Sequence, residues 1–158
     1  MDFDEQTILL VEDNEGDVYL FKRVVNKAGI KNPVQVVRTG EQAVGYLAGT
    51  GKYEDRHQYP LPFLIMLDLK LPLKDGLDVL QWMRQRPDLA SIKVIVLTSS
   101  SEPRDVERAN RLGALSYLVK PPSQETLLQI MEGLRGAESN GGSPSRLQLP
   151  GSLFNDAT

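Results

Sequence analysis

The sequence contains no cysteine, a single histidine and no long hydrophobic run. Without cysteine among its 158 residues, the chain has no disulfide, no thiolate metal site and no cysteine nucleophile. No apolar run approaches the length that a membrane-spanning helix needs, so we expect no transmembrane segment. The first residues, MDFDEQ, are acidic and lack the basic-then-apolar layout of a signal peptide. We therefore expect a cytoplasmic protein.

The sequence also lacks an excess of charge of either sign. It has 18 basic and 21 acidic residues, which gives a net charge of -3. No basic excess exists to pair with phosphates, so we expect binding neither to nucleic acid nor to a membrane surface. With 41% hydrophobic and 25% charged residues, the composition is typical of a globular domain with an ordinary core.

Apolar runs alternate with amphipathic stretches along the chain. This alternation predicts an α/β fold with a doubly wound, five-stranded parallel sheet that carries helices on both faces. Short runs of β-branched and aliphatic residues predict strands. In the stretches between these runs, apolar residues recur about every 3.6 positions, which predicts helices. The expected strands are 7–11, 34–37, 63–67, 93–98 and 114–119. The expected helices are 14–28, 39–48, 77 to about 86, 102–112 and 123 to about 134.

The segment 136–158 differs in composition from residues 1–135, which we expect to form the domain. Ten of its 23 residues are Gly, Pro or Ser, which is typical of a tail. Its apolar residues leave two alternatives open. Either the tail is disordered, or it docks on its own domain or on a neighbouring chain through Leu147, Leu149, Leu153 and Phe154.

Polar side chains follow four of the predicted strands, at the point where each strand ends. Glu12 and Asp13 follow the first strand, Asp68 the third, Thr98 ends the fourth, and Lys120 follows the fifth. The carboxyl ends of parallel strands meet at one edge of a sheet, which is where such folds place their sites. Each residue alone is typical of a loop or a helix cap. Their joint placement predicts that three acids, one hydroxyl and one cation converge.

Three carboxylates at close range repel one another unless a cation intervenes. Mg²⁺ suits the set, because it prefers oxygen ligands and is held by one or two carboxylates with several waters. Asp68 is then a candidate carboxylate nucleophile that forms an aspartyl phosphate. The ammonium of Lys120 would offset charge on the transferred group, and the hydroxyl of Thr98 would donate to a phosphoryl oxygen.

Two other readings of these residues fit less well. A haloacid-dehalogenase-like phosphatase needs a second Asp two positions after the nucleophile, and Asp68-Leu69-Lys70 lacks it. A flavodoxin-like nucleotide binder needs a Ser/Thr/Gly loop after the first strand, whereas Glu12-Asp13 would repel phosphate without a metal.

Four motifs resemble those of the receiver domain of two-component response regulators. They are LLVEDN (9–14), MLDLKLP (66–72) followed by Asp75-Gly76, VLTSS (96–100) and YLVKP (117–121). The resemblance covers about residues 5–135. It implies the flavodoxin-like (βα)5 receiver fold with strand order 2-1-3-4-5. It also implies a single-domain response regulator in phosphorelay signal transduction, which is a signalling phosphoacceptor and not an enzyme with a separate substrate.

The resemblance assigns the acidic residues to phosphoryl transfer and metal binding. It implies that Asp68 accepts a phosphoryl group from a phosphohistidine on a partner sensor histidine kinase. Asp13 and Asp68 would ligate Mg²⁺, Glu12 would act directly or through a water, and the backbone carbonyl of Lys70 would be a further ligand. Many receivers have Asp where this chain has Glu12. The side chain of Lys70 would flank the phosphate entry and either slow or steer hydrolysis of the phosphoaspartate.

The resemblance also assigns the remaining residues of the edge. Thr98 and Lys120 would bind the phosphoryl oxygens. Tyr117 matches a switch aromatic that turns inward when the Thr98 hydroxyl moves. The Lys120–Pro121 peptide bond matches one that is cis in the family.

The EDN start, the long connection at 49–62 and the LPLKDG loop resemble single-domain regulators that pair with phytochrome-type kinases. His57 lies alone in that polar connection, so the phosphohistidine is expected from another protein. We expect output through a homodimer formed by the fourth helix, fifth strand and fifth helix. The alternative is a pseudo-receiver, an interaction module that is never phosphorylated; retention of the acid, hydroxyl and lysine set weighs against it.

Overall fold

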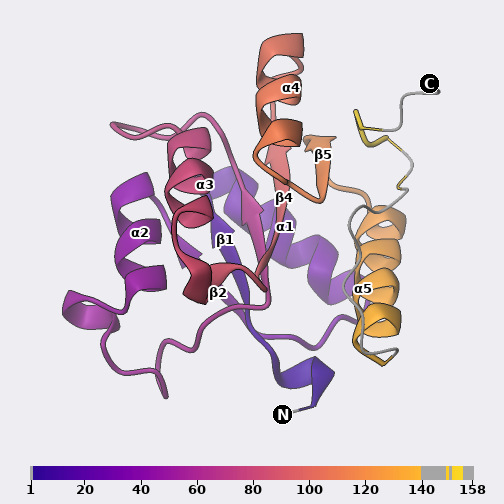
Figure 1. Ribbon diagram of the computed structural model, residues 1–158. Coiled ribbons are helices and arrows are strands. Elements are labelled where there is room, and N and C mark those ends of the chain that lie inside the picture. The colour runs from indigo at the N-terminus through magenta and orange to yellow at the C-terminus, as the bar shows by residue number, and fades with distance from the viewer. Residues whose placement is uncertain (1, 140–148, 150, 155–158) are drawn as a thin grey trace.

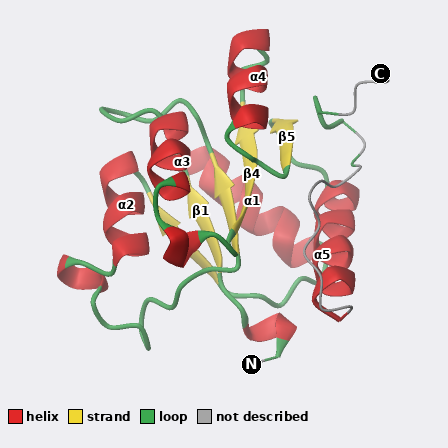
Figure 2. Cartoon of the chain, viewed as in Figure 1, coloured by secondary structure: helices red, strands yellow, loops and turns green. Residues whose placement is uncertain are grey.

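The computed structural model describes residues 2–139, 149 and 151–154 as five parallel strands in the order β2-β1-β3-β4-β5, with helices between them (Figures 1 and 2). This confirms the predicted fold class and strand order. The strands are β1 (Ile8–Val11), β2 (Val34–Val37), β3 (Leu64–Leu67), β4 (Lys93–Thr98) and β5 (Ser116–Val119). The helices are α1 (Glu15–Lys27), α2 (Gly40–Ala48), α3 (Gly76–Arg84), α4 (Pro103–Arg111) and α5 (Gln124–Ser139). Three 3₁₀ turns are η1 (Phe3–Glu5), η2 (Gly51–Tyr53) and η3 (Pro87–Leu89).

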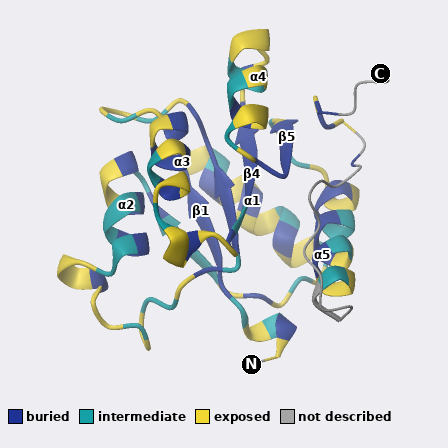
Figure 3. Cartoon of the chain, viewed as in Figure 1, coloured by how far each residue is buried: buried dark blue, intermediate teal, exposed yellow. Residues whose placement is uncertain are grey.

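The helices cover both faces of the sheet. Helices α1 and α5 pack together on one face, and α2, α3 and α4 pack in sequence on the other. All four residues of β1 and of β3 are buried, and Figure 3 shows the sheet as the buried centre of the molecule. Central parallel strands are covered on both sides, which explains why their sequences are continuous apolar runs. No helix in the described part of the chain combines the length and the apolar character that crossing a membrane requires.

Side-chain caps fix where several helices begin. Asn14 accepts from the amide of Asp17 at 2.9 Å, Thr39 from that of Gln42 at 3.0 Å, and Ser123 from that of Thr126 at 3.0 Å. Helix α4 differs. Its N-cap is Glu102, which makes no side-chain cap, and Pro103 is its first residue. Proline is favoured there because the first helical N–H has no partner within the helix.

Helix α5 is longer than the sequence suggests. It extends to Ser139, past Gly136 and past the predicted end near Leu134. Glycine inside a helix costs only about 1 kcal/mol relative to alanine, so it does not have to end one. The division of the chain after residue 135 therefore falls within a helix, and the assignment of two separate parts stays a prediction.

The segment 149–154, without residue 150, crosses the outer edge of β5. Leu149 is buried in the cluster between the sheet and helices α1 and α5, whereas Phe154 is buried in the cluster on the opposite face. Between them, the Leu153 amide donates to the Tyr117 carbonyl at 2.9 Å, and the hydroxyls of Ser116 and Ser152 lie 2.6 Å apart. These residues cover polar backbone at an edge strand, where such groups otherwise stay unpaired. Of the apolar tail residues named above, Leu147 lies outside the described residues.

Candidate functional site

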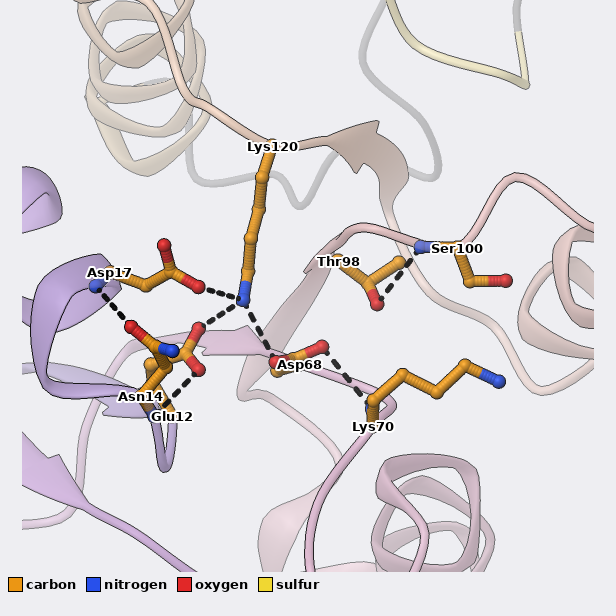
Figure 4. Close-up of polar contacts among 8 residues, drawn as sticks. All are labelled: Glu12, Asn14, Asp17, Asp68, Lys70, Thr98, Ser100 and Lys120. Atoms are coloured by element: carbon orange, nitrogen blue, oxygen red, sulfur yellow. Dashed lines mark hydrogen bonds and ion pairs between the residues drawn. The ribbon is translucent and has the colours of Figure 1, made fainter.

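Asp68 directly follows β3 at the carboxyl edge of the sheet. The residue is 4% exposed, and its amide donates to the Val11 carbonyl at 3.1 Å, which continues the pairing of β3 with β1. Its side chain accepts two hydrogen bonds, from the Lys70 amide at 3.2 Å and from Lys120 Nζ at 2.9 Å (Figure 4). Burial of a carboxylate is costly unless it is paired and hydrogen-bonded. These two donors supply that compensation, and the ammonium offsets the charge.

Lys120 reaches back from the end of β5 into the same edge. Its Nζ lies 2.6 Å from Glu12 Oε1, 2.8 Å from Asp17 Oδ2 and 2.9 Å from Asp68 Oδ2 (Figure 4). Burial of the side chain lowers the pKa of Lys120, but the hydrogen bonds to the three carboxylates outweigh burial and hold its pKa above the ordinary value. The ammonium is therefore charged at neutral pH. The peptide bond that follows, Lys120–Pro121, is cis, as expected.

Glu12, Asp13 and Asp68 form an acidic cluster. One carboxylate oxygen from each lies within 4.8 Å of the others. Glu12 is buried and accepts from the Asn14 amide at 3.1 Å, whereas Asp13 is exposed. Burial raises the pKa of Glu12, and the hydrogen bond from Lys120 opposes that rise. Adjacent oxygens of this kind are the ligands that Mg²⁺ and related hard cations prefer. The structure thus brings together the three acids that the sequence predicted.

Lys70 presents its backbone to the site, and its side chain extends away from Asp68 (Figure 4). Its Nζ lies 3.7 Å from Asp105 Oδ2 on α4, and its side chain is exposed. The other contact of Asp105 is with the hydroxyl of Ser100, at 2.8 Å. The two contacts connect the loop after β3 with the start of α4. The role of the Lys70 carbonyl as a metal ligand stays a prediction.

Thr98 and Tyr117 lie on the side of the site toward α4, and both side chains contact Ser100. Thr98 is fully buried, and its Oγ1 accepts weakly from the Ser100 amide at 3.4 Å. Tyr117 is also fully buried and donates its hydroxyl to the Ser100 carbonyl at 2.9 Å. Burial raises the pKa of Tyr117, so the phenol stays protonated as a donor. The ring of Phe154 lies 6.1 Å from that of Tyr117, between ring centroids.

The backbone after Asp68 is tightly constrained. Gly76 begins α3 against this loop: a Cβ at that position would clash with the Asp68 carbonyl oxygen and would lie 2.9 Å from the Leu69 Cα. Asp75 caps the helix by accepting from the Leu77 amide at 3.1 Å. Leu73 lies between Asp68 and Asp75 in this loop. It is 94% exposed and has a φ of 68°, a left-handed conformation that is uncommon for a residue other than glycine.

Sequence reasoning missed two residues of the site, Asp17 and Asp105. Neither residue directly follows a predicted strand, which is the pattern that identified the other residues of the site. The signal for Asp17 was its place one turn after Glu12-Asp13, at a helix start next to the same sheet edge. No local pattern identifies its partner, because Lys120 lies 103 residues away along the chain.

Comparisons with known proteins agree with this geometry. The response regulator receiver domain family matches residues 8–132. The response regulator Rcp1 of Synechocystis sp. is 38% identical over 129 residues, which span 82% of this chain and 86% of Rcp1. The crystal structure of the phosphorylated cyanobacterial phytochrome response regulator RcpA is 32% identical. It has a TM-score of 0.71, and the match covers 92% of this chain and 99% of RcpA.

The crystal structure of the Mn²⁺-bound form of Rcp1 is also similar, with 36% identity and a TM-score of 0.68. The match covers 92% of this chain and 99% of that one. The family match spans most of the chain and includes every residue of the acidic cluster, together with Thr98 and Lys120. This chain therefore belongs to the response regulator receiver domain family, is similar to phytochrome-associated single-domain regulators, and acts in two-component signalling.

Proposed function

We propose that this chain accepts a phosphoryl group on Asp68 from the phosphohistidine of a partner sensor histidine kinase, in a reaction that depends on Mg²⁺. The observation that carries the proposal is the carboxylate of Asp68. It is buried at the carboxyl edge of the sheet, bonded to the Lys120 ammonium and adjacent to two further acids. A carboxylate held in this way can act as a nucleophile, and the Lys120 ammonium beside it would offset the charge of the phosphoryl group that it receives.

The donor set of the acidic cluster fits a divalent cation. Its ligand atoms are all carboxylate oxygens, and they converge within 4.8 Å. We propose that Asp13 and Asp68 hold Mg²⁺, that Glu12 acts directly or through water, and that the Lys70 carbonyl completes the protein ligands. A Mn²⁺-bound form is known for the similar protein Rcp1, which supports the binding of a divalent cation by this chain. When bound, the metal would neutralise part of the acidic charge and orient a phosphoryl oxygen.

Asp68, Lys120 and Thr98 would each have a separate role in the phosphoryl transfer. An oxygen of the Asp68 carboxylate attacks the phosphorus of the phosphohistidine, so that an O–P bond forms as the P–N bond breaks. The electron pair of the P–N bond stays on the leaving imidazole nitrogen of the kinase. The Lys120 ammonium donates to the transferred group and offsets its charge, and Thr98 donates its hydroxyl to a second phosphoryl oxygen. Phosphoryl transfer needs such positioning and charge stabilisation more than covalent assistance.

We also propose that Tyr117 acts as a switch. Thr98 and Tyr117 both contact Ser100, so a Thr98 hydroxyl that turns toward a phosphoryl group changes the loop that the Tyr117 hydroxyl bonds. We expect two conformations, one in which the Thr98 hydroxyl stays with Ser100 and one in which it turns toward the phosphoryl group. Phosphorylation shifts the equilibrium between them only if the phosphoryl group contacts the two conformations differently, and the Thr98 hydroxyl would contact it in one of them alone. The output surface would be the α4–β5–α5 face.

Through that face we propose a homodimer. Val119 is 38% exposed and Leu153 39% exposed, so apolar groups remain on β5 and on the tail segment beside it. Light scattering over a concentration series tests the proposal, with and without phosphorylation. A monomer at every concentration in both states would contradict it. Deletion of 136–158 should weaken the dimer if the tail crosses to the partner, and leave it unchanged if it does not.

We propose a phytochrome-type sensor kinase as the partner, with both proteins in the cytoplasm. Support comes from RcpA, a phytochrome response regulator that matches this chain over most of its length. The phosphohistidine is expected on the kinase, since His57 is the single histidine of this chain and lies in the polar 49–62 connection with no kinase motif around it. Phosphotransfer assayed against a panel of purified kinases would test this partner choice, and a preference for kinases without a phytochrome module would contradict it.

Intact-mass spectrometry after incubation with a small phosphodonor tests the chemistry. We expect one added phosphoryl group in Mg²⁺, none in EDTA, and none in Asp68→Asn. Asp78→Asn is a control, because it removes an exposed carboxylate that pairs with Arg108 and lies outside the acidic cluster; it should still be labelled. Labelling of Asp68→Asn, or equal labelling without metal, would refute the mechanism. A wild-type protein that is never labelled would favour the pseudo-receiver alternative.

A further inference from the structure

The ammonium of Lys120 has three N–H donors and three carboxylates within hydrogen-bond distance. The contacts are 2.6 Å to Glu12, 2.8 Å to Asp17 and 2.9 Å to Asp68. The lysine side chain is 14% exposed and enters the site from the β5 side, whereas Asp17 lies in the first turn of α1 (Figure 4). All three donors therefore have an acceptor before any phosphoryl group arrives.

The three carboxylates are not equivalent. Glu12 and Asp68 belong to the acidic cluster, and Asp68 also becomes esterified in the proposed reaction. Asp17 lies outside that cluster, so neither metal binding nor phosphorylation consumes its oxygens. The Asn14 cap holds the backbone of Asp17 at 2.9 Å, which fixes the start of the helix that carries the carboxylate. Asp17 is thus the acceptor that remains with Lys120 throughout the reaction.

A lysine needs such an anchor because its four-carbon side chain has many rotamers and its charge has no preferred direction. An ammonium held on one side by Asp17 keeps its other N–H groups directed toward Asp68. Without that contact, the ammonium has no partner outside the reacting centre to hold it there. The Asp17 carboxylate is about one-third exposed, so its ion pair with Lys120 should contribute little to the stability of the protein. We expect loss of Asp17 to change the rate of phosphorylation instead.

We propose that Asp17 is a positioning residue, which holds the Lys120 ammonium in place to receive the phosphoryl group on Asp68. This inference rests on the proposed phosphoryl transfer and assigns a part in it to a residue outside the acidic cluster. Asp17 acts through Lys120 and does not touch the reacting atoms.

The first test measures phosphorylation by a small phosphodonor at saturating Mg²⁺. Asp17→Ala should lower the maximum rate by roughly tenfold, less than the ~100-fold that a displacement of about 1 Å can cost. The donor concentration for half-maximal rate should not rise, because removal of a negative charge does not repel an anionic donor. Asp17→Glu should recover part of the rate. Glu15→Ala is the matched control: it removes an acid from the same helical turn, where Glu15 pairs with Arg38 and not with Lys120.

A double-mutant cycle separates positioning from a general charge effect. In the Lys120→Ala background, Asp17→Ala should cause no further loss of rate, because the group that it positions is gone. An equal tenfold loss in both backgrounds would overturn the inference. So would a wild-type rate in Asp17→Ala, with the proposed function left standing. If the wild-type protein is not phosphorylated at all, the proposed function fails, and the inference fails with it.

A second readout needs neither metal nor phosphodonor. In ¹⁵N-lysine-labelled protein in EDTA, the Lys120 ammonium should exchange its protons slowly, since all three have acceptors. Asp17→Ala should accelerate that exchange, and Glu15→Ala should leave it unchanged. Unaltered exchange in Asp17→Ala would show that the carboxylate does not hold the ammonium, and would overturn the inference whatever the phosphorylation rates.

Discussion

Substitution of Asp13 by Asn should stabilise the metal-free protein and destabilise the metal-bound protein. Asp13 is the exposed member of the acidic cluster, and its oxygen lies within 4.8 Å of both Glu12 and Asp68. No ion pair joins Asp13 to Lys120, whereas both of its neighbours have one. In the absence of metal, Asp13 therefore contributes repulsion without a compensating contact to the ammonium.

The magnitude follows from Coulomb's law. The oxygens lie at most 4.8 Å apart, and at that limit one pair of charges repels by about 0.9 kcal/mol in water and by about 3.5 kcal/mol at an effective dielectric constant of 20. Exposure of Asp13 places it near the lower figure, and the ammonium of Lys120 offsets part of the charge on its neighbours. We expect Asp13→Asn to raise the free energy of unfolding by about 1 kcal/mol in EDTA at low ionic strength.

Saturating Mg²⁺ should reverse the order of the two proteins. A ligand that binds only the folded state stabilises it by about 2.7 kcal/mol at a hundred times its dissociation constant, and the variant should lose most of that gain. Urea unfolding followed by the fluorescence of Trp82 measures both quantities. Glu41→Gln is the control, because it removes an acid from the first turn of α2, outside the cluster. It should lower stability by a few tenths of a kcal/mol in both buffers through the helix dipole.

Two results would refute this reasoning. An Asp13→Asn protein that is less stable than wild type in EDTA would show that the cluster is not under repulsion. A variant that gains as much stability from Mg²⁺ as wild type would show that Asp13 does not contribute to metal binding.

Three further predictions concern the aromatic residues. Burial raises the pKa of Tyr46 to about 12, so the stability that its protonated phenol provides should be complete below pH 10 and be lost as the pH rises toward 12. Absorbance at 295 nm should show Tyr46 among the late-titrating tyrosines, with Tyr117, whose pKa burial also raises. Tyr117→Phe should lower the free energy of unfolding by about 1 kcal/mol in urea, because the Ser100 carbonyl loses a buried donor, and labelling of Asp68 should persist. Phe154→Ala should lower the free energy of unfolding in the same assay, by no more than deletion of 149–158 does, because the deletion removes the same buried side chain. An unchanged free energy would show that Phe154 does not dock on the core.

The sequence was sufficient for the fold and for most of the site because the relevant signals are local. The central strands β1 and β3 are uninterrupted apolar runs, and each ends directly at an acidic residue of the site. Once the runs are recognised as parallel strands, convergence of Glu12, Asp68 and Lys120 follows from topology alone. The register bears this out: Val11 of β1 pairs with Leu67 of β3, so the residues that follow them emerge side by side.

The parts that sequence could not provide depend on distances between elements. The contact of Asp17 with Lys120 requires the start of α1 to lie next to the loop after β5, and no periodicity encodes that separation. The end of α5 depends on packing, since Leu134 is buried and the helix continues beyond it despite Gly136. The path of residues 149–154 over β5 likewise rests on burial of Leu149 and Phe154, in a segment whose composition is typical of a tail.

The close approach of Gly76 to Asp68 determines which half of the site is able to move. The main chain of Asp68 is held on one side by the Val11 carbonyl and on the other by the start of α3, which leaves no room even for a methyl group. Asp68, the proposed phosphoacceptor, therefore lies on a main chain with little freedom to move. If Asp68 is phosphorylated as proposed, the structural change has to arise on the opposite side of the site, where the hydrogen bonds of Ser100 to Thr98 and Tyr117 can exchange without displacing the strand that bears Asp68.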